Sequence, residues 1–159
     1  MQRRTVLGGG LTLGLMIPFA TGCTKKPVVV PTPAPDVAVL TGAIRSEEQL
    51  IALYEVVTQA HPDLTARLGP MLAHHRDHLS VLRRHYIPAT GEAPTPTPTP
   101  RPVPPAQPLP ALRGAERQAA ADRVRDVTGV SAGMAQLLAA IGACEAGHAA
   151  LLNRTGTGQ

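Results

Sequence analysis

The sequence predicts an all-α protein, a bundle of four helices arranged as two helical hairpins. Four segments carry apolar residues at the three- and four-residue spacing of a helix face, and no segment shows a convincing strand pattern. A proline-rich tract at residues 88–110 separates the first two segments from the last two. Two hairpins joined by a long connection are the simplest way to bury four such faces. The predicted helices cover residues 46–60, 62–86, 109–127 and 131–153.

Residues 1–22 are predicted to be a signal peptide. They begin with Arg3 and Arg4, continue with an apolar run interrupted by glycine, and end with small residues before Cys23. The apolar run is too short for a comfortable membrane span, which needs about 20 apolar residues. The letters ATGC, which end at Cys23, resemble a lipobox, although Ala20 stands where leucine is more usual. This resemblance implies that Cys23 carries lipid and begins the mature protein.

Two export routes are open. Arg3 and Arg4, followed by Thr-Val-Leu, resemble a twin-arginine signal, which implies export of an already folded protein. Ordinary secretory signals also begin with arginines, so the general secretory route stays open as well. By either route we expect the protein to be anchored through lipid on Cys23 to the outer face of the cytoplasmic membrane.

Residues 23–45 are predicted to be a proline-rich tether, because proline removes backbone donors and favours an extended chain. Residues 154–159 are expected to form a flexible tail. Removal of the signal peptide lowers the net charge from +4 to +2, since Arg3 and Arg4 leave without any acidic residue. Such a small charge does not indicate nucleic-acid binding. The membrane is the expected partner, and the sequence identifies no protein partner.

The first predicted helix, residues 46–60, begins with a serine cap followed by Glu47 and Glu48 in its first turn. Tyr54 lies on its apolar face, and Glu55 projects to the side. This assignment leaves the first helix without an inward carboxylate. The apolar face consists of Leu50, Leu53, Tyr54 and Val57.

The second predicted helix, residues 62–86, opens at Pro62, which suits a first turn. His75 lies near the centre of its inner face, and His78 lies at the edge of that face. His74 falls off the face and is expected to be in solvent. The apolar members of the face are Leu68, Leu72, Leu79, Leu82 and Tyr86.

The tract at residues 88–110 contains Thr-Pro repeats, which build neither a helix nor a sheet, so we expect an exposed crossover. The third predicted helix, residues 109–127, presents Glu116 and Arg123 on one inner face, two turns apart. The remaining members of this face are Leu112, Ala115, Ala119 and Val127.

Glu145 and His148 lie in the middle of the apolar face of the fourth predicted helix, residues 131–153. A buried charge without a partner costs on the order of several kcal/mol, so both side chains need another side chain or a metal ion. Cys144, at the edge of the face, is expected to pack as a small buried hydrophobe. The apolar members are Met134, Leu137, Leu138, Ile141 and Leu152.

The inward polar residues form a candidate metal site. Ferritin-like carboxylate bundles place a glutamate on each of two helices and a Glu-x-x-His pair on each of the other two. Glu116 together with Glu145 and His148 matches half of that set. His75 and His78 form a His-x-x-His pair where the pattern has Glu-x-x-His.

Three stretches of the chain also resemble the ferritin-like domain of exported bacterial lipoproteins of unassigned role. They are LIALYEVVTQAHPDLTARLGPMLAHHRDHLSVL, ALRGAERQAAADRV and LLAAIGACEAGHAALL, within residues 46–153. The resemblance implies a four-helix fold with, at most, a degenerate site for iron or another divalent metal, and it implies no particular activity. A paired-iron oxidase needs carboxylates to bridge two ions, so that chemistry is disfavoured here, and a single metal ion stays open.

A metal-free alternative is open for the same residues. Arg123 shares its inner face with Glu116, so an ionic network of Glu116, Glu145, Arg123 and His148 would satisfy its members without a ligand. Structural ion pairs are commoner than metal sites, which favours this alternative.

Motifs of other enzyme classes are missing from the sequence, which has no glycine-rich phosphate loop, nucleophile elbow or Cys-x-x-Cys pair. Whether the protein is an enzyme stays open. The first functional hypothesis is a non-catalytic binding or interaction module at the cell surface. The alternative is a metal-binding or redox protein that uses Glu116, Glu145, His148, His75 and His78.

Overall fold

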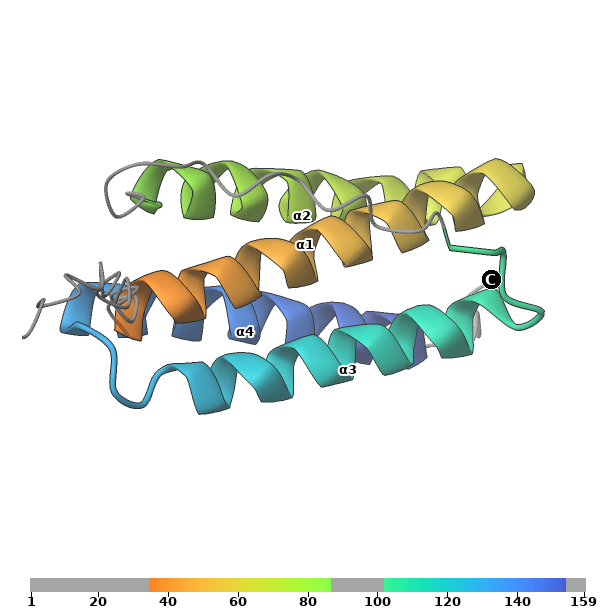
Figure 1. Cartoon of the computed structure of the whole chain (residues 1–159). Helices are drawn as coiled ribbons and strands as arrows, with labels where there is room; N and C mark the ends of the chain where they lie inside the picture. The colour runs from red at the N-terminus through yellow and green to blue at the C-terminus, as the bar shows by residue number, and fades with distance from the viewer. Residues whose placement is uncertain (1–34, 87–101, 154–159) are drawn as a thin grey trace, which may run out of the picture. The chain divides into compact units, whose positions relative to one another are not determined.

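The computed structural model describes residues 35–86 and 102–153. These residues form four α helices, and Figure 1 shows α1 antiparallel to α2 and α3 antiparallel to α4. The described residues include no strand, which confirms the all-α prediction. The short 3-10 turn Pro62–Leu64 joins the first two helices. The helices are α1 (Pro35–Ala60), α2 (Thr65–His85), α3 (Pro108–Asp126) and α4 (Ala132–Asn153).

The predicted start of the first helix at residue 46 is wrong. Helix α1 begins at Pro35, so residues 35–45, which were assigned to the tether, are helical. Proline suits a first turn because its missing N–H is not needed there, and Asp36 complements the positive end of the helix dipole. Leu40 and Ala43 are buried and continue the apolar stripe toward the N-terminus. The predicted signal peptide and tail lie outside the described residues.

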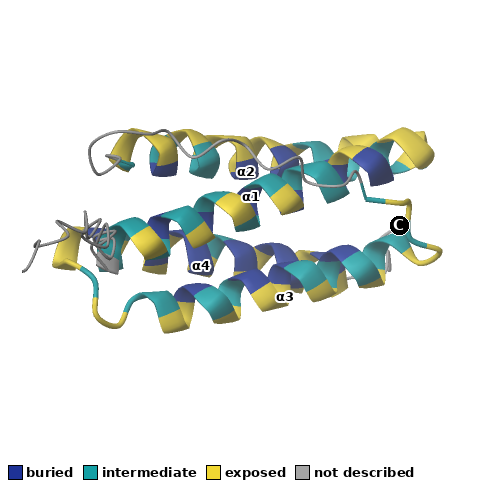
Figure 2. Ribbon diagram, in the orientation of Figure 1, coloured by how far each residue is buried: buried dark blue, intermediate teal, exposed yellow. Residues whose placement is uncertain are grey.

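A layer of polar side chains separates two apolar clusters inside the bundle. On α1, α2 and α4 the buried polar residues lie between residues of one apolar cluster and residues of the other. Figure 2 shows the buried positions along the inner faces of the helices. One cluster surrounds Tyr54 and the other surrounds Leu138. The first contains Tyr54, Val56, Val57, Leu68, Met71, Leu72, Leu112 and Leu152. The second contains Leu40, Ala43, Leu82, Met134, Leu138 and Ile141.

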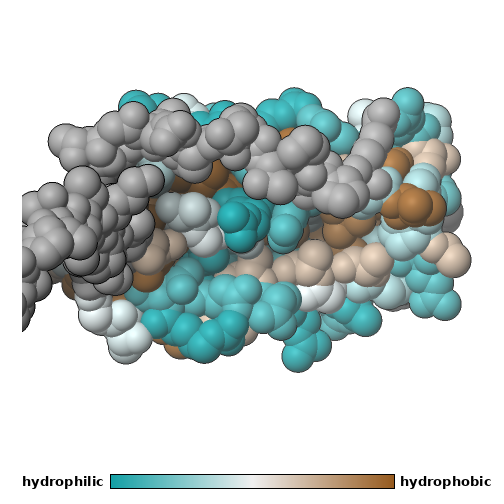
Figure 3. Space-filling view, in the orientation of Figure 1, coloured by the Kyte–Doolittle hydropathy of each residue, from teal (hydrophilic) through white to brown (hydrophobic). Residues whose placement is uncertain are grey.

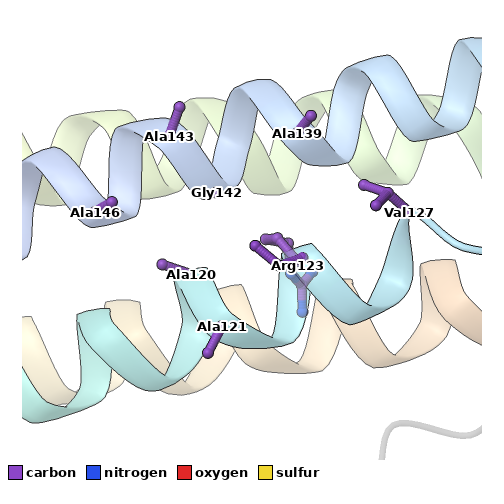
Figure 4. Close-up of a pocket in the computed structure, with 9 residues that line it drawn as sticks. Ala120, Ala121, Arg123, Val127, Ala139, Gly142, Ala143 and Ala146 are labelled. Atoms are coloured by element: carbon purple, nitrogen blue, oxygen red, sulfur yellow. The ribbon is translucent and has the colours of Figure 1, made fainter.

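Helices α3 and α4 approach each other closely where Gly142 faces Arg123 (Figure 4). A Cβ atom on Gly142 would lie 2.7 Å from the Cβ of Arg123, so a larger residue cannot fit without a shift. An apolar groove of about 460 Å³ runs along this contact and is lined mainly by alanines and valines. The part of the surface over α3 in Figure 3 is mainly hydrophilic, in keeping with the exposed Arg117 and Arg125.

Helix α4 is long and apolar enough in composition to cross a membrane. Within the bundle, Met134, Leu138, Ile141 and Leu152 of α4 belong to the two core clusters, and Glu145 and His148 lie on its buried face. The larger apolar side chains of α4 therefore contribute mainly to the core, whereas Leu151 and several alanines are exposed.

Candidate metal centre

The structure places the predicted residues together in the polar layer. His75, Glu116 and Glu145 are 0% exposed, and His148 is 4% exposed. His78 lies at the edge of the layer, with 17% of its side chain exposed. These residues come from α2, α3 and α4, and they lie inside the bundle or at its edge, as their helical spacing predicted.

Glu47 of α1 also belongs to the polar layer, and the prediction that the first helix has no inward carboxylate is wrong. Its side chain is fully buried. Since α1 begins at Pro35, Glu47 lies in the helix interior and not in the first turn. A buried stripe on α1 advances in alternating steps of three and four residues, which is the signal that could have identified this glutamate. The stripe consists of Leu40, Ala43, Glu47, Leu50, Tyr54 and Val57.

His75 bridges two carboxylates. Its Nδ1 lies 2.9 Å from Glu47 Oε2, and its Nε2 lies 2.8 Å from Glu116 Oε1. Ionised carboxylate oxygens only accept hydrogen bonds, so both ring nitrogens must donate and His75 is an imidazolium. Burial lowers the pKa of His75, but the hydrogen bonds and charges of Glu116 and Glu47 outweigh this effect and raise the pKa to about 9.

His78 approaches the same carboxylate of α1, with its Nδ1 3.2 Å from Glu47 Oε1. Burial raises the pKa of Glu47, but the hydrogen bonds and charges of His75 and His78 outweigh it, and the pKa is lowered overall. Glu47 is therefore ionised at neutral pH.

Glu116 lies among three donor groups. Its Oε1 accepts hydrogen bonds from His75 and from the Tyr54 hydroxyl at 2.5 Å. His148 Nδ1 lies 3.3 Å from the same oxygen, at ion-pair distance but without hydrogen-bond geometry. Burial raises the pKa of Glu116, yet His148, His75 and Tyr54 together lower it to about 2. Its Oε2 has no hydrogen-bond partner among the described residues.

Glu145 is the least satisfied group of the layer, because neither of its oxygens has a hydrogen-bond partner within residues 35–86 and 102–153. Burial raises the pKa of Glu145 to about 8, and the charges of Glu47 and Glu116 act in the same direction against that of Arg123. Without a cation, this carboxyl group is protonated at neutral pH.

The predicted ionic network around Arg123 is wrong in its pairing. Arg123 is buried on the inner face, but its Nη2 lies 3.2 Å from Asp126 of the same helix. In the described part of the chain it forms no ion pair or hydrogen bond with Glu116 or Glu145, and its Nε and Nη1 have no partner. The ion pairs of Glu116 are made by His75 and His148.

Two further residues lie against the layer where α2 meets α4. His74 is exposed as predicted, but its Nδ1 lies 3.0 Å from His148 Nε2. Cys144 was expected to be a buried hydrophobe, whereas it is only partly buried, with its Sγ 3.5 Å from the same nitrogen of His148. The contact of His74 with His148 depends on the packing of α2 against α4, which the spacing within one helix does not show, whereas Cys144 and His148 are four residues apart on α4.

The donor atoms fit a metal ion. In the described residues, three sets of donor atoms lie within 4.8 Å of one another. Two of them belong to the polar layer, and imidazole and carboxylate together suit divalent first-row metals. In this layer Glu116 Oε2, both oxygens of Glu145 and Nδ1 of His148 have no hydrogen bond within the described residues, so they could act as ligands. The three sets are Glu47, His75 and His78; His75, Glu116 and His148; and His74, Cys144 and His148.

The proposed lipid site Cys23 and the export residues Arg3 and Arg4 lie outside the described residues. Comparisons of this chain with protein-family models, with curated proteins and with solved structures give no match.

Proposed function

We propose that the protein is an exported lipoprotein whose ferritin-like helical bundle binds one divalent transition-metal ion in its polar layer. The single observation that carries this proposal is Glu145, a fully buried carboxyl group with no hydrogen-bond partner in the described part of the chain. A buried polar group without a partner costs about 1–3 kcal/mol, and a bound cation would remove that cost.

The surroundings of Glu145 support a cation. Glu116 Oε2 and His148 Nδ1 also lack a hydrogen bond among the described residues, and the charges of Glu47 and Glu116 are close enough to raise the pKa of Glu145. These groups come from α1, α3 and α4, and His75 of α2 lies among them. Each of the four helices therefore contributes a carboxylate or an imidazole side chain to the polar layer. Ferritin-like metal sites are built in the same way.

Charge balance favours a single divalent ion. In the metal-free layer Glu47 and Glu116 are negative, His75 is positive and Glu145 is neutral, which sums to minus one, and the charge of Arg123 is balanced by its ion pair with Asp126. Loss of one proton each from His75 and Glu145 would leave minus three, and a divalent ion would restore minus one. A second divalent ion would make the buried layer positive. The ion would supply Lewis-acid chemistry, or redox chemistry if it is iron.

A manganese(II) titration of the purified protein, followed by the electron paramagnetic resonance of the free ion, tests this proposal. We expect saturation near one ion per chain, with binding weakened about tenfold or more in Glu145→Gln and Glu116→Gln. Glu145→Gln keeps the neutral side chain of the metal-free layer, so it should fold. The matched control is Glu55→Gln, which removes an exposed carboxylate paired with Arg76. Equal binding in the wild type and Glu145→Gln, or no saturable binding, would overturn the proposal.

A second candidate function is a non-catalytic binding module, and the apolar groove between α3 and α4 favours it. Val124, which lines this groove, is 71% exposed, and the neighbouring alanines leave room for an apolar partner. Under this alternative, Val124→Glu would abolish partner capture while leaving manganese binding unchanged. If Val124→Glu still captures the partner, the groove between α3 and α4 is not the binding site.

Export and anchoring are part of the proposal and have their own test. In the native host, Cys23→Ala should move the protein from the membrane fraction to the soluble fraction. Replacement of both Arg3 and Arg4 by lysine should block export if the twin-arginine route is used, and should have little effect on the general secretory route. A Cys23→Ala protein that stays in the membrane fraction would exclude lipid anchoring.

A further inference from the structure

A cysteine and two histidines meet at the surface where α2 packs against α4. Cys144 and His148 are four residues apart on α4, so they lie on the same side of the helix, and His74 comes from α2. The Nδ1 of His74 lies 3.0 Å from the Nε2 of His148, and the Sγ of Cys144 lies 3.5 Å from that Nε2. The Sγ of Cys144 lies 3.9 Å from the Nδ1 of His74.

These separations are those of ligands that share one ion. With zinc bonds of about 2.0 Å to nitrogen and about 2.3 Å to sulfur, tetrahedral ligands lie roughly 3.3–3.6 Å apart. The three observed distances bracket this range, so small movements of side chains on the protein surface would complete the geometry. His74 is exposed and Cys144 is partly exposed, which leaves the fourth position open to solvent.

We propose that His74, Cys144 and His148 form a second metal site, at the surface of the bundle, for an ion that prefers thiolate and imidazole ligands, such as zinc(II). The site uses Nε2 of His148, whereas Nδ1 of the same ring lies beside Glu116 in the polar layer. It therefore does not need a metal ion in the layer, although the two sites share the ring of His148.

Other roles for Cys144 fit the structure less well. Burial raises the pKa of its thiol, and the charges of Glu116, Glu145 and Glu47 add to this, so a free nucleophilic thiolate is disfavoured. Cys23 is the only other cysteine in the sequence, and it is the predicted lipid site. A bound metal ion would displace the thiol proton directly.

Cobalt(II) titration of the whole protein under reducing conditions tests the site. A thiolate-to-cobalt charge-transfer absorption should appear in the near ultraviolet and saturate. Cys144→Ser should abolish this absorption, and His74→Gln, at an exposed position where the fold is not at risk, should weaken cobalt binding about tenfold or more.

Matched variants identify the source of the signal. Cys23→Ser and Glu116→Gln should keep the absorption, because neither residue belongs to the surface site. Absence of the absorption in the wild type, an unchanged affinity in His74→Gln, or loss of the absorption in Glu116→Gln would each overturn the proposal. Manganese binding reports on the polar layer separately, so failure of one site is distinguishable from failure of the other.

Discussion

His75 Nε2 lies 2.8 Å from Glu116 Oε1, and this fully buried ion pair joins the first helical hairpin to the second. The other ring nitrogen of His75 contacts Glu47, so the imidazolium stands between carboxylates from α1 and α3. The two hairpins therefore meet in the polar layer through charge as well as through the apolar clusters on either side of it.

Removal of His75 should destabilise the metal-free protein strongly. His75→Ala leaves the carboxylates of Glu47 and Glu116 buried without their shared cation, which costs roughly 3–5 kcal/mol when a buried pair is broken. For a domain of this size we expect the melting temperature, followed by circular dichroism, to fall by more than about 10 °C. His78→Ala is the control, since His78 is partly exposed and pairs with Glu47 from the edge of the layer. If the melting temperature of His75→Ala falls no further than that of His78→Ala, His75 is not the essential partner of the two carboxylates.

The metal-free protein should lose stability as the pH rises above neutrality. The pKa of His75 is raised from 6.5 to about 9, and that of Glu145 from 4.5 to about 8. The folded state thus binds more protons than the unfolded state, and this protonation stabilises the fold. Each group contributes fully at a pH below its pKa in the unfolded chain, and the contributions are lost as the pH rises through 8 and 9. Glu116 acts oppositely, because its pKa is lowered from 4.5 to about 2, so its contribution is lost only in acid.

Urea unfolding in the presence of a chelator measures this dependence. Each unit of pKa change is worth about 1.4 kcal/mol, so we expect the free energy of unfolding to fall by about 3 kcal/mol or more between pH near 6 and pH near 9. Glu145→Gln cannot ionise and should show a smaller fall. A free energy that stays level or rises across this range would show that the layer is not protonated as its contacts imply.

Replacement of Gly142 by alanine should destabilise the protein. Gly142→Ala places a Cβ 2.7 Å from Arg123 Cβ, an atom close to the backbone of α3 that cannot move aside freely. Overpacking of this kind costs about 1–3 kcal/mol, which thermal unfolding would detect. Gly147→Ala is the matched control on the same helix, where nothing lies within 4 Å of the added methyl group. There the better helix propensity of alanine should raise stability by up to about 1 kcal/mol, so equal effects of the two variants would refute the close packing.

Helical spacing predicted the burial of His75, Glu116, Glu145 and His148, because a helix in a bundle turns the same face inward throughout. Glu47 was missed because Ser46, Glu47 and Glu48 match a helix start, although the stripe already continues back through Ala43 to Leu40. The contact of His74 with His148 depends on how α2 packs against α4, and no pattern within one segment contains that information. The pairing of Arg123 with Asp126 also depends on side-chain geometry, which the sequence pattern does not contain.

If both proposed sites exist, they should compete for His148. A neutral imidazole offers one lone pair, so an ion on Nε2 at the surface leaves Nδ1 protonated, and that proton faces Glu116 instead of a metal ion. Conversely, an ion held by Nδ1 in the polar layer leaves Nε2 protonated toward His74 and Cys144. Manganese(II) prefers carboxylate and imidazole to thiolate. Saturation with manganese(II) should therefore weaken cobalt binding at the surface site of the wild type about tenfold, as followed by the cobalt–thiolate absorption. Glu116→Gln, which loses the inner site, should show no such weakening. Equal weakening in both proteins would mean that manganese competes at the surface itself, and no weakening in either would show that His148 does not link the sites.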